Sequence, residues 1–341
     1  GDGRFVLPSP FLCGGRSGDA PKMTGMETWM RHSTISRRGI LVGLGAVAAA
    51  FAIRARPSST SPLTVPPNRD FGGSPLITSI DQLITSLASQ TPPIVLDASV
   101  LADYRDQHIP GARHVWWQDT MELNSRWYGT VLKADDDQGT QTRRLGFLQR
   151  LGIDGSRPVV VYDHSDGQHA ARICWFLTFL SVPASVLDGG FAGWLGANQP
   201  SASDAPQINT AVSPTVTPQN GFYLAAEQVN NRLAAGTGHL IDCRTANELA
   251  DGRYAKTVIP NAVQIDRTVL LDGDQLLVGT PEIESVVPFP LTDPIYLIAE
   301  TGVDCALPWL ALKLAGAGSI EIVDGGLQQW IDQVDAPSST A

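Results

Sequence analysis

The sequence carries one segment twice, almost without a gap. Residues 160–194, VVYDHSDGQHAARICWFLTFLSVPASVLDGGFAGW, are matched by residues 296–330, YLIAETGVDCALPWLALKLAGAGSIEIVDGGLQQW. Both segments end in the same DGG-x-x-x-W pattern. Each reads as an apolar strand, a short loop, an amphipathic helix and a second strand that runs into a Gly-Gly turn. This order predicts an α/β fold in which a strand-to-helix loop lies in the middle of each copy.

The duplication also covers the chain upstream of these segments. Residues 94–112, IVLDASVLADYRDQHIPGA, are matched by LIDCR at 240–244 and VIPNA at 258–262. We therefore expect tandem domains at residues 74–200 and 222–335, joined by a proline-rich linker at 201–221. Strands that alternate with helices predict, in each domain, a mostly parallel sheet flanked by helices.

The first 73 residues read as segments outside the two domains. Residues 26–56 contain Ser36-Arg37-Arg38-Gly39 followed by an uncharged run from Ile40 to Ile53. This pattern resembles a twin-arginine export signal. The run would span only about 21 Å as a helix, which is short of a ~30 Å hydrocarbon core. We expect a doubtful leader at 1–25, the signal at 26–56 and a tether at 57–73.

The signal predicts a periplasmic or lumenal protein, weakly anchored if the signal is not cleaved. The alternative is an ordinary surface helix that begins with two arginines.

Charge and cysteine content exclude several classes of function. The formal net charge is −10, and the first 56 residues hold 8 of the 24 basic residues but only 3 of the 34 acidic ones. Residues 57–341 are therefore strongly acidic. This charge disfavours nucleic acid and anionic membranes as partners. Of the cysteines, Cys174 and Cys243 fit buried small hydrophobic positions. The sequence has no metal-ligand spacing, so we expect no metal and no cofactor.

Four motifs, in duplicate order, identify a family. They are LDASVLADYRDQHIPGA, VLDGGFAGW, LIDCRTANELADGR and IVDGGLQQW. Together they resemble the rhodanese family of sulfurtransferases, and the resemblance covers nearly all of residues 74–335. The tandem arrangement is similar to thiosulfate and 3-mercaptopyruvate sulfurtransferases. The resemblance implies a silent first domain and a second domain with a persulfide-forming cysteine on its strand-to-helix loop.

The corresponding loop of this chain lacks that cysteine. The loop consists of Ala299, Glu300, Thr301, Gly302, Val303, Asp304 and Cys305. Ala299 stands in the family's nucleophile position, and Asp163 stands there in the first copy. Backbone N–H groups of such a loop favour a thiolate or a persulfide anion, but an alanine methyl group cannot hold sulfur. The charges of Glu300 and Asp304 oppose an anionic sulfur donor.

Cys305 is a possible substitute nucleophile. It lies in the expected first turn of the next helix, where the helix N-terminus favours a thiolate and Asp304 opposes it. We expect it to pack in the core rather than to react. A Cys-dependent phosphatase is disfavoured because the Cys-x5-Arg loop is missing.

Other polar residues near the loops are expected to be structural. Asp97, Arg172, Asp242 and Arg244 are expected to fix the loops through ion pairs and hydrogen bonds. His164 and His169 read as part of a polar surface loop, although their spacing also allows an acid/base or metal site. Trp116, Trp117 and Trp127 are expected in the core or at the domain interface.

The sequence therefore predicts an exported, catalytically degenerate member of this family that binds an unknown protein partner or a small anion. The alternative is an active thiosulfate or 3-mercaptopyruvate sulfurtransferase that uses Cys305 or another route. No membrane span beyond the signal is expected.

Overall fold

Each sequence copy folds around a five-stranded parallel sheet. The computed structural model describes residues 71, 73–122, 125–131, 138–215, 217–272 and 276–335. The strand order is β1-β5-β4-β2-β3 in the first sheet and β6-β12-β11-β7-β8 in the second. Because the two orders are equivalent, the duplication seen in the sequence is also a duplication of topology. The expected pair of α/β domains, each with a parallel sheet flanked by helices, is confirmed.

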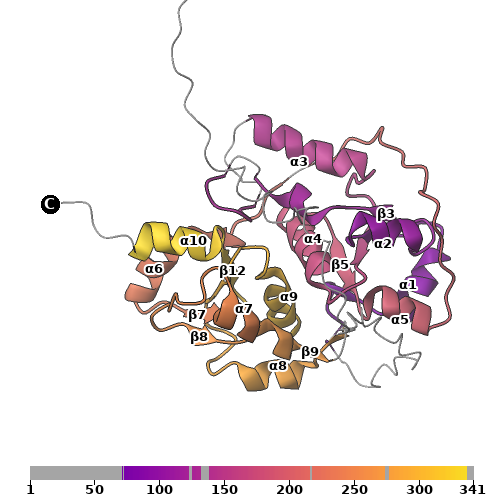
Figure 1. Cartoon of the computed structure of the whole chain (residues 1–341). Coiled ribbons are helices and arrows are strands. Elements are labelled where there is room, and N and C mark those ends of the chain that lie inside the picture. The colour runs from indigo at the N-terminus through magenta and orange to yellow at the C-terminus, as the bar shows by residue number, and fades with distance from the viewer. Residues whose placement is uncertain are drawn as a thin grey trace, which may run out of the picture. The chain divides into compact units, whose positions relative to one another are not determined.

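The first copy follows the expected alternation of strands and helices (Figure 1). Its strands are β1 Ile77–Thr78, β2 Ile94–Asp97, β3 Arg113–His114, β4 Val159–Tyr162 and β5 Ala184–Leu187. Its helices are α1 Ile80–Leu87, α2 Leu101–Asp106, α3 Gln138–Arg150, α4 Gln168–Phe179 and α5 Gly190–Gly196, with a 3-10 turn at Trp117–Thr120.

The second copy repeats this order and adds a small hairpin. Its strands are β6 Tyr223–Leu224, β7 His239–Asp242, β8 Val263–Gln264, β11 Ile295–Ile298 and β12 Ile320–Val323, and β9 Leu271–Asp272 pairs with β10 Leu276–Leu277. Its helices are α6 Ala226–Ala234, α7 Ala246–Asp251, α8 Thr280–Val286, α9 Ala306–Leu314 and α10 Gly326–Trp330. A 3-10 turn at Arg267–Leu270 and a π-helical turn at Ile331–Asp335 complete it.

The central strands are apolar because helices cover both faces of each sheet. All residues of β4 and β11 are buried, as expected for strands inside a parallel sheet. In the register, Asp97 lies beside Tyr162 and Asp242 lies beside Ile298. The polar residues that end the strands therefore gather at the carboxyl edge of each sheet, where α/β proteins place their functional loops.

Side-chain caps fix the start of two helices. Ser79 and Gln82 form a capping box at the start of α1, and Thr245 and Glu248 form one at the start of α7. Each box satisfies backbone N–H groups that the first helical turn leaves without a partner.

The two copies share one apolar core. All described residues belong to a single compact unit, and α4 packs against α9 within it (Figure 1). Aromatic rings continue this contact, since the Phe222 ring lies 5.8 Å from Trp175 and 5.9 Å from Trp309. Burial of such rings is among the larger contributions to stability that a core contact makes.

The N-terminal segments fall almost wholly outside the described part of the chain. The leader at 1–25 and the signal at 26–56 lie outside the described residues, and the tether is described only at residues 71 and 73. Among the helices that the structure describes, none is both long enough and apolar enough to cross a bilayer.

Candidate functional site

The candidate site is the loop that joins β11 to α9. Ala299 follows the last residue of β11 directly, and its side chain is fully buried. The Ala299 carbonyl oxygen accepts a hydrogen bond from Leu327 N at 3.0 Å, and the Ile298 carbonyl accepts one from Cys243 N at 2.8 Å. The loop is therefore held from both sides at the point where the strand ends.

Hydrogen bonds within the loop engage the backbone N–H groups of Thr301, Val303 and Ala306. Asp304 Oδ2 accepts from Thr301 N at 3.1 Å and from Thr301 Oγ1 at 2.8 Å. Thr301 Oγ1 in turn accepts from Val303 N at 3.2 Å. Ala306 N donates to the Val303 carbonyl at 3.1 Å. These three N–H groups thus point at oxygen atoms of the loop itself.

The equivalent N–H groups in the loop of the first copy donate to a different acceptor, the Asp163 side chain. Asp163, the counterpart of Ala299, is almost fully buried. Its Oδ1 accepts from Ser165 N at 2.8 Å and Gly167 N at 3.1 Å, and its Oδ2 accepts from Ala170 N at 3.0 Å. The first-copy loop therefore holds a negative charge at its centre, as loops before a helix N-terminus commonly do.

A position-by-position comparison shows how the hydrogen bonds of the two loops differ. Ser165, Gly167 and Ala170 correspond to Thr301, Val303 and Ala306 in the aligned segments. In the first copy these N–H groups converge on one carboxylate, whereas in the second they bond to three separate acceptors within the loop. The second loop therefore lacks the convergence of these three donors on a central anion, and α9 begins two aligned positions later than α4.

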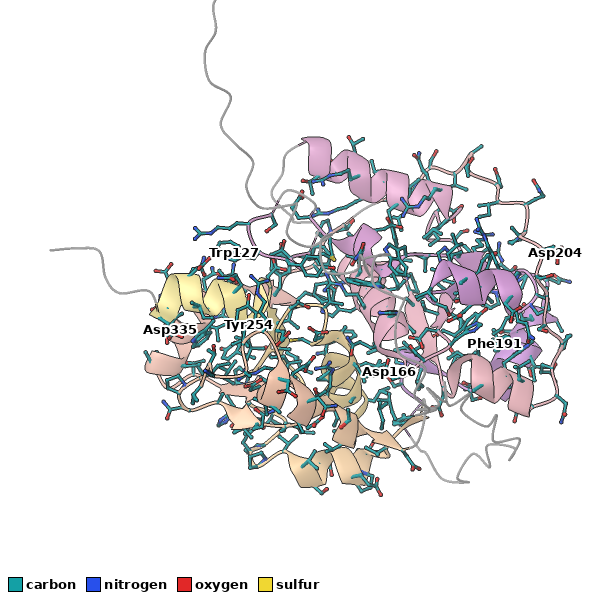
Figure 2. All side chains as sticks on the ribbon, viewed as in Figure 1. Trp127, Asp166, Phe191, Asp204, Tyr254 and Asp335 are labelled. Atoms are coloured by element: carbon teal, nitrogen blue, oxygen red, sulfur yellow. The ribbon has the colours of Figure 1, made fainter. Side chains whose placement is uncertain are left out.

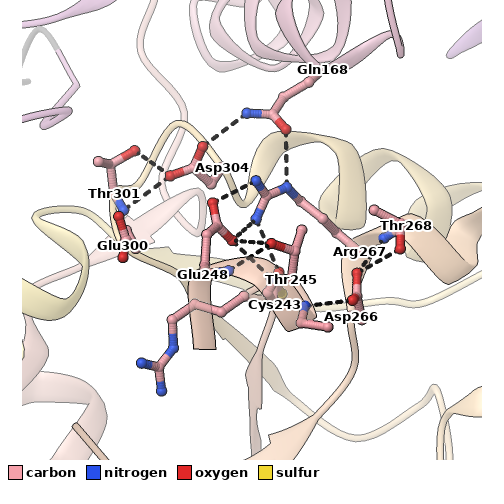
Figure 3. A network of polar contacts seen from close by, with 12 residues as sticks. Gln168, Cys243, Thr245, Glu248, Asp266, Arg267, Thr268, Glu300, Thr301 and Asp304 are labelled. Carbon is pink, nitrogen blue, oxygen red and sulfur yellow. Dashed lines mark hydrogen bonds and ion pairs between the residues drawn. The ribbon is translucent and has the colours of Figure 1, made fainter. Parts of the chain in front are cut away.

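A polar network ties the loop to the first copy (Figure 3). Gln168 Nε2, from the first turn of α4, donates to Asp304 Oδ1 at 2.8 Å. Arg267 Nε donates to Gln168 Oε1 at 3.0 Å. The Arg267 guanidinium also forms a bidentate pair with Glu248, at 2.5 and 2.7 Å. Both carboxylate oxygens of Asp304 are thereby engaged, one within the loop and one across the copies.

The same network shifts the titration of its charged members. Burial alone would lower the pKa of Arg267, but its hydrogen bonds to Glu248 and the nearby charge of Asp304 raise that pKa overall. Burial alone would raise the pKa of Glu248, but the Arg267 hydrogen bonds and the Thr245 N–H lower it overall. Both residues are therefore charged at neutral pH.

Cys305 is a buried thiol at the start of α9. Its side chain is fully buried, and its Sγ lies 3.9 Å from the Thr301 carbonyl oxygen. Burial, the neighbouring Cys243 thiol and the charge of Asp304 raise the Cys305 pKa well above its usual value. Burial likewise raises the pKa of Cys174 to about 12. The helix N-terminus thus does not outweigh burial, and Cys305 is a protonated thiol at neutral pH.

Arg172 brings a buried positive charge toward the loop from α4. Its side chain is fully buried, and its guanidinium lies over the Trp175 ring, 4.7 Å from the centroid. Arg172 Nε donates to Thr120 Oγ1 at 3.0 Å, while Nη1 has no acceptor in the described part of the chain. Burial lowers the Arg172 pKa to about 10, although nearby Asp324 opposes this shift.

Residues 125–131 of the first copy lie over the loop of the second. Val131 N donates to Asp324 Oδ1 at 2.7 Å, and Trp127 Nε1 donates to Asp332 Oδ2 at 2.9 Å (Figure 2). Gly129 approaches so closely that a Cβ atom there would meet Thr301 Cβ at 2.8 Å. Trp127 thus lies where the two copies meet, and the candidate loop is covered from the first copy.

The other predicted structural residues pair at the strand ends. The Arg244 guanidinium contacts Asp242 at 2.6 Å and donates to the backbone carbonyls of Tyr254 and Thr257, both at 2.9 Å. Asp97 accepts from Ser99 N at 2.9 Å and lies 3.2 Å from His164 Nε2. These contacts hold the backbone around the loops.

Both histidines of the first-copy loop lie against aromatic rings. The His164 ring stacks on Phe191 with the centroids 4.1 Å apart, and the His169 ring stacks on Trp117 at 5.5 Å. Within the described residues, no three His, Cys, Asp or Glu side chains are placed to bind a metal ion. Glu300 is half-buried, with its Oε1 3.5 Å from Tyr254 N.

A family model for the Rhodanese-like domain matches the chain twice, at residues 79–197 and 225–333. The chain belongs to the rhodanese family. Rhodanese relatives of known activity are moderately similar to it. Thiosulfate sulfurtransferase of Rattus norvegicus is 27% identical over 256 residues, covering 70% of this chain and 81% of that protein. The 3-mercaptopyruvate sulfurtransferase of Escherichia coli K12 is 26% identical over 257 residues, covering 71% and 86%.

Solved structures share the rhodanese fold. The 3-mercaptopyruvate sulfotransferase SseA of Escherichia coli superposes with a TM-score of 0.63 at 20% identity, covering 73% of this chain and 98% of that one. The wild-type structure of EanB gives a TM-score of 0.65 at 18% identity, covering 77% and 68%. At these sequence identities, both structural similarities show a shared fold alone.

The sequence did not indicate the residues that contact the second copy's loop region from distant parts of the chain. Gln168 and Arg267 were not singled out, because neither belongs to a local motif. Gly129 and Val131 were also missed, since nothing in their sequence indicates a contact with the other copy. The duplication offered one usable signal, which was the comparison of Asp163 with Ala299.

Proposed function

We propose that this rhodanese-family protein is an exported binding module that does not transfer sulfur. The observation that carries the proposal is the hydrogen bonding of Thr301, Val303 and Ala306, whose N–H groups all bond within their own loop. Their first-copy counterparts converge on the Asp163 carboxylate. A persulfide needs that convergence, because its negative charge is stabilised by donors aimed at one point.

The available sulfur atoms support the same proposal. The side chain at 299 is a methyl group, and the Cys305 thiol is fully buried with a raised pKa. The attacking species in sulfur transfer is a thiolate that the donor can reach. Cys305 meets neither requirement in this structure.

The charge of the loop acts in the same direction. Asp304 places a carboxylate within hydrogen-bonding distance of the Thr301 N–H. An anionic donor would have to displace this carboxylate and approach its charge at close range. We therefore favour a protein partner over a small anion at this loop.

A cyanolysis assay tests the proposal. Purified protein is given thiosulfate or 3-mercaptopyruvate as donor and cyanide as acceptor, and thiocyanate is measured. We expect no turnover by the unaltered protein. Turnover that disappears in Cys305→Ser would instead establish the sulfurtransferase alternative.

Two variants at position 299 show whether the scaffold can be repaired. Activity that appears in Ala299→Cys but not in Ala299→Ser would mean that only the nucleophile is missing. Equal inactivity of both would mean that the loop's own hydrogen bonds also prevent the reaction.

Export is the second part of the proposal. It rests on Arg37, Arg38 and the uncharged run from Ile40 to Ile53. In a bacterial host with twin-arginine transport, we expect the protein in the exported fraction. Lysine at both arginine positions should keep it in the cytoplasm, and unchanged export of that variant would count against this route.

A further inference from the structure

An extended chain segment covers one end of the first copy. Trp194 Nε1 donates to the Pro200 carbonyl at 2.7 Å. Ala202 then pairs with His108 as an isolated antiparallel bridge, with N–O distances of 2.8 and 2.9 Å. His108 is fully buried beneath this segment. The segment is part of the connection to the second copy, and Asp204 marks it in Figure 2.

Among the described residues, the second copy has the corresponding surface without a covering segment. Trp330 corresponds to Trp194, and Val258 corresponds to His108. Trp330 Nε1 is buried and has no acceptor among the described residues. Val258 is 80% exposed, and neither its N–H nor its carbonyl has a partner in that part of the chain. Both groups that hold the segment in the first copy are thus unused in the second.

A cavity lies between these two places. It has a volume of about 450 Å³ and is lined by Leu233, Leu240, Pro260, Asn261 and Trp330, among others. Its lining combines apolar side chains with the amides of Asn230 and Asn261 and with His239 and Asp335, and such a mixed lining suits a peptide with small side chains and a free main chain. An unmatched buried N–H is also costly, so a carbonyl that reaches Trp330 recovers free energy.

The helix ends explain why the described residues of the two copies take different paths after Trp194 and Trp330. In the first copy, α5 ends at Gly196, Asn198 with a φ of 55° then turns the chain back, and Gln199 N bonds to the Trp194 carbonyl. Asparagine tolerates this left-handed conformation. Val334 stands in the same place in the second copy, and a β-branched residue disfavours it. The helix instead continues through the π-helical turn to Asp335 (Figure 2).

We infer that the surface formed by Val258, Pro260 and Trp330 binds an extended peptide from another polypeptide chain. The peptide pairs with the Val258 main chain as Ala202 pairs with His108, and one of its carbonyls accepts from Trp330 Nε1. Val334 and Asp335 line the cavity, so the π-helical turn moves aside when the carbonyl reaches the buried indole. This inference rests on the binding role proposed above and names a partner class at a surface apart from the β11–α9 loop.

The sequence that fills the first copy supplies the probe. A synthetic peptide Gln-Pro-Ser-Ala-Ser-Asp, the sequence of residues 199–204, is blocked at both ends and titrated into the full chain labelled with ¹⁵N-tryptophan. The indole N–H resonance of Trp330, assigned with Trp330→Phe, should shift downfield and saturate. The affinity of Trp330→Phe should fall about 5- to 10-fold, because one hydrogen bond is lost while the ring stays.

Two controls keep the result specific. Trp194→Phe should leave the affinity unchanged, because its cavity is already filled by the chain. The same peptide with an N-methylated alanine cannot donate to the Val258 carbonyl and should bind more weakly. Absence of a saturable shift, or equal binding of the methylated peptide, would overturn the inference.

A shortened chain distinguishes two possible occupants of the surface, a peptide from another polypeptide and residues 336–341. Binding that is the same in a chain ending at Asp335 supports an occupant from another polypeptide. Binding that appears only after residues 336–341 are removed assigns the surface to the protein's own end and overturns the inference. Cyanolysis by the unaltered protein would refute the absence of sulfur transfer while leaving the peptide result intact.

Discussion

Asp304 and Thr301 form a closed pair inside the candidate loop. The carboxylate of Asp304 accepts from both the backbone N–H and the hydroxyl of Thr301, at 3.1 and 2.8 Å. The equivalent N–H in the first copy donates to Asp163, whose carboxylate lies at the centre of that loop. The second copy therefore supplies its negative charge from the edge of the loop and leaves a methyl group at the centre.

Removal of the Asp304 carboxylate should make the loop more favourable to a thiolate at position 299. We expect the thiol introduced by Ala299→Cys to react slowly with iodoacetamide at pH 7. Adding Asp304→Ala should speed the reaction about 10-fold, because the Thr301 N–H becomes available and a like charge is lost, which together lower the thiol pKa by about one unit. Asp166→Ala, in the first-copy loop, is the matched control. Equal rates with and without Asp304 would contradict the closed-pair explanation.

Cys305 should be unreactive in the folded protein. Its pKa is raised well above the usual value by burial and by the Cys243 thiol, so the thiolate form is scarce at neutral pH. Cys13 lies outside the described residues, so it is first replaced by serine. In this Cys13→Ser protein, we expect a disulfide reagent to label less than about a tenth of the thiols at pH 7.5. Full labelling should require unfolding in urea. Rapid labelling that Cys305→Ser removes would show an accessible thiol.

The buried pair of Asp242 and Arg244 should be costly to break. The Arg244 side chain is 2% exposed and the Asp242 side chain 5%. Replacing only one partner, as in Arg244→Met, leaves a buried charge unpaired and should lower the free energy of unfolding by about 3–5 kcal/mol. Arg126→Met serves as the control, since Arg126 is 75% exposed in its pair with Asp332 and should cost less than about 1 kcal/mol. Urea unfolding measures both, and similar losses would contradict this view.

Protonation of Asp97 should lower the free energy of unfolding in acid. Burial alone would raise the Asp97 pKa, but hydrogen bonds from His164 and Ser99 outweigh it and lower the pKa below 3.8. A lowered folded-state pKa gives stability that is present above pH 3.8 and is lost as the pH falls through the folded value. Below about pH 4, the urea midpoint of Asp97→Asn should therefore change less with pH than the midpoint of the unaltered protein. Asp103→Asn, on the surface of α2, should follow the unaltered curve, and parallel curves for all three would refute the assignment.

Local patterns were sufficient for the fold. The buried runs at β4 and β11, the DGG-x-x-x-W turns and the repeated element order all follow from where apolar residues fall along the chain. The two sheets have equivalent strand orders because the two copies carry the same pattern. The absence of cysteine at 299 was likewise visible from sequence, through comparison with Asp163.

The chemistry of the site depended on contacts that no local pattern encodes. The sequence left open whether Cys305 faces the core or the loop, and packing of α9 beneath the loop buries it. Gln168 reaches Asp304 from the other copy, over 136 residues of sequence separation. Such contacts depend on how distant segments pack, so they become visible only in three dimensions.

The sequence by itself thus determined a duplicated α/β fold, its family and the alanine at position 299, because burial periodicity and residue identity are local properties. The tertiary structure decided which donors meet which acceptors. It showed the Thr301 N–H satisfied by Asp304 and the Trp330 N–H left without an acceptor. Hydrogen bonding requires atoms to lie within about 3.5 Å in the right direction, and only the packed chain fixes those positions.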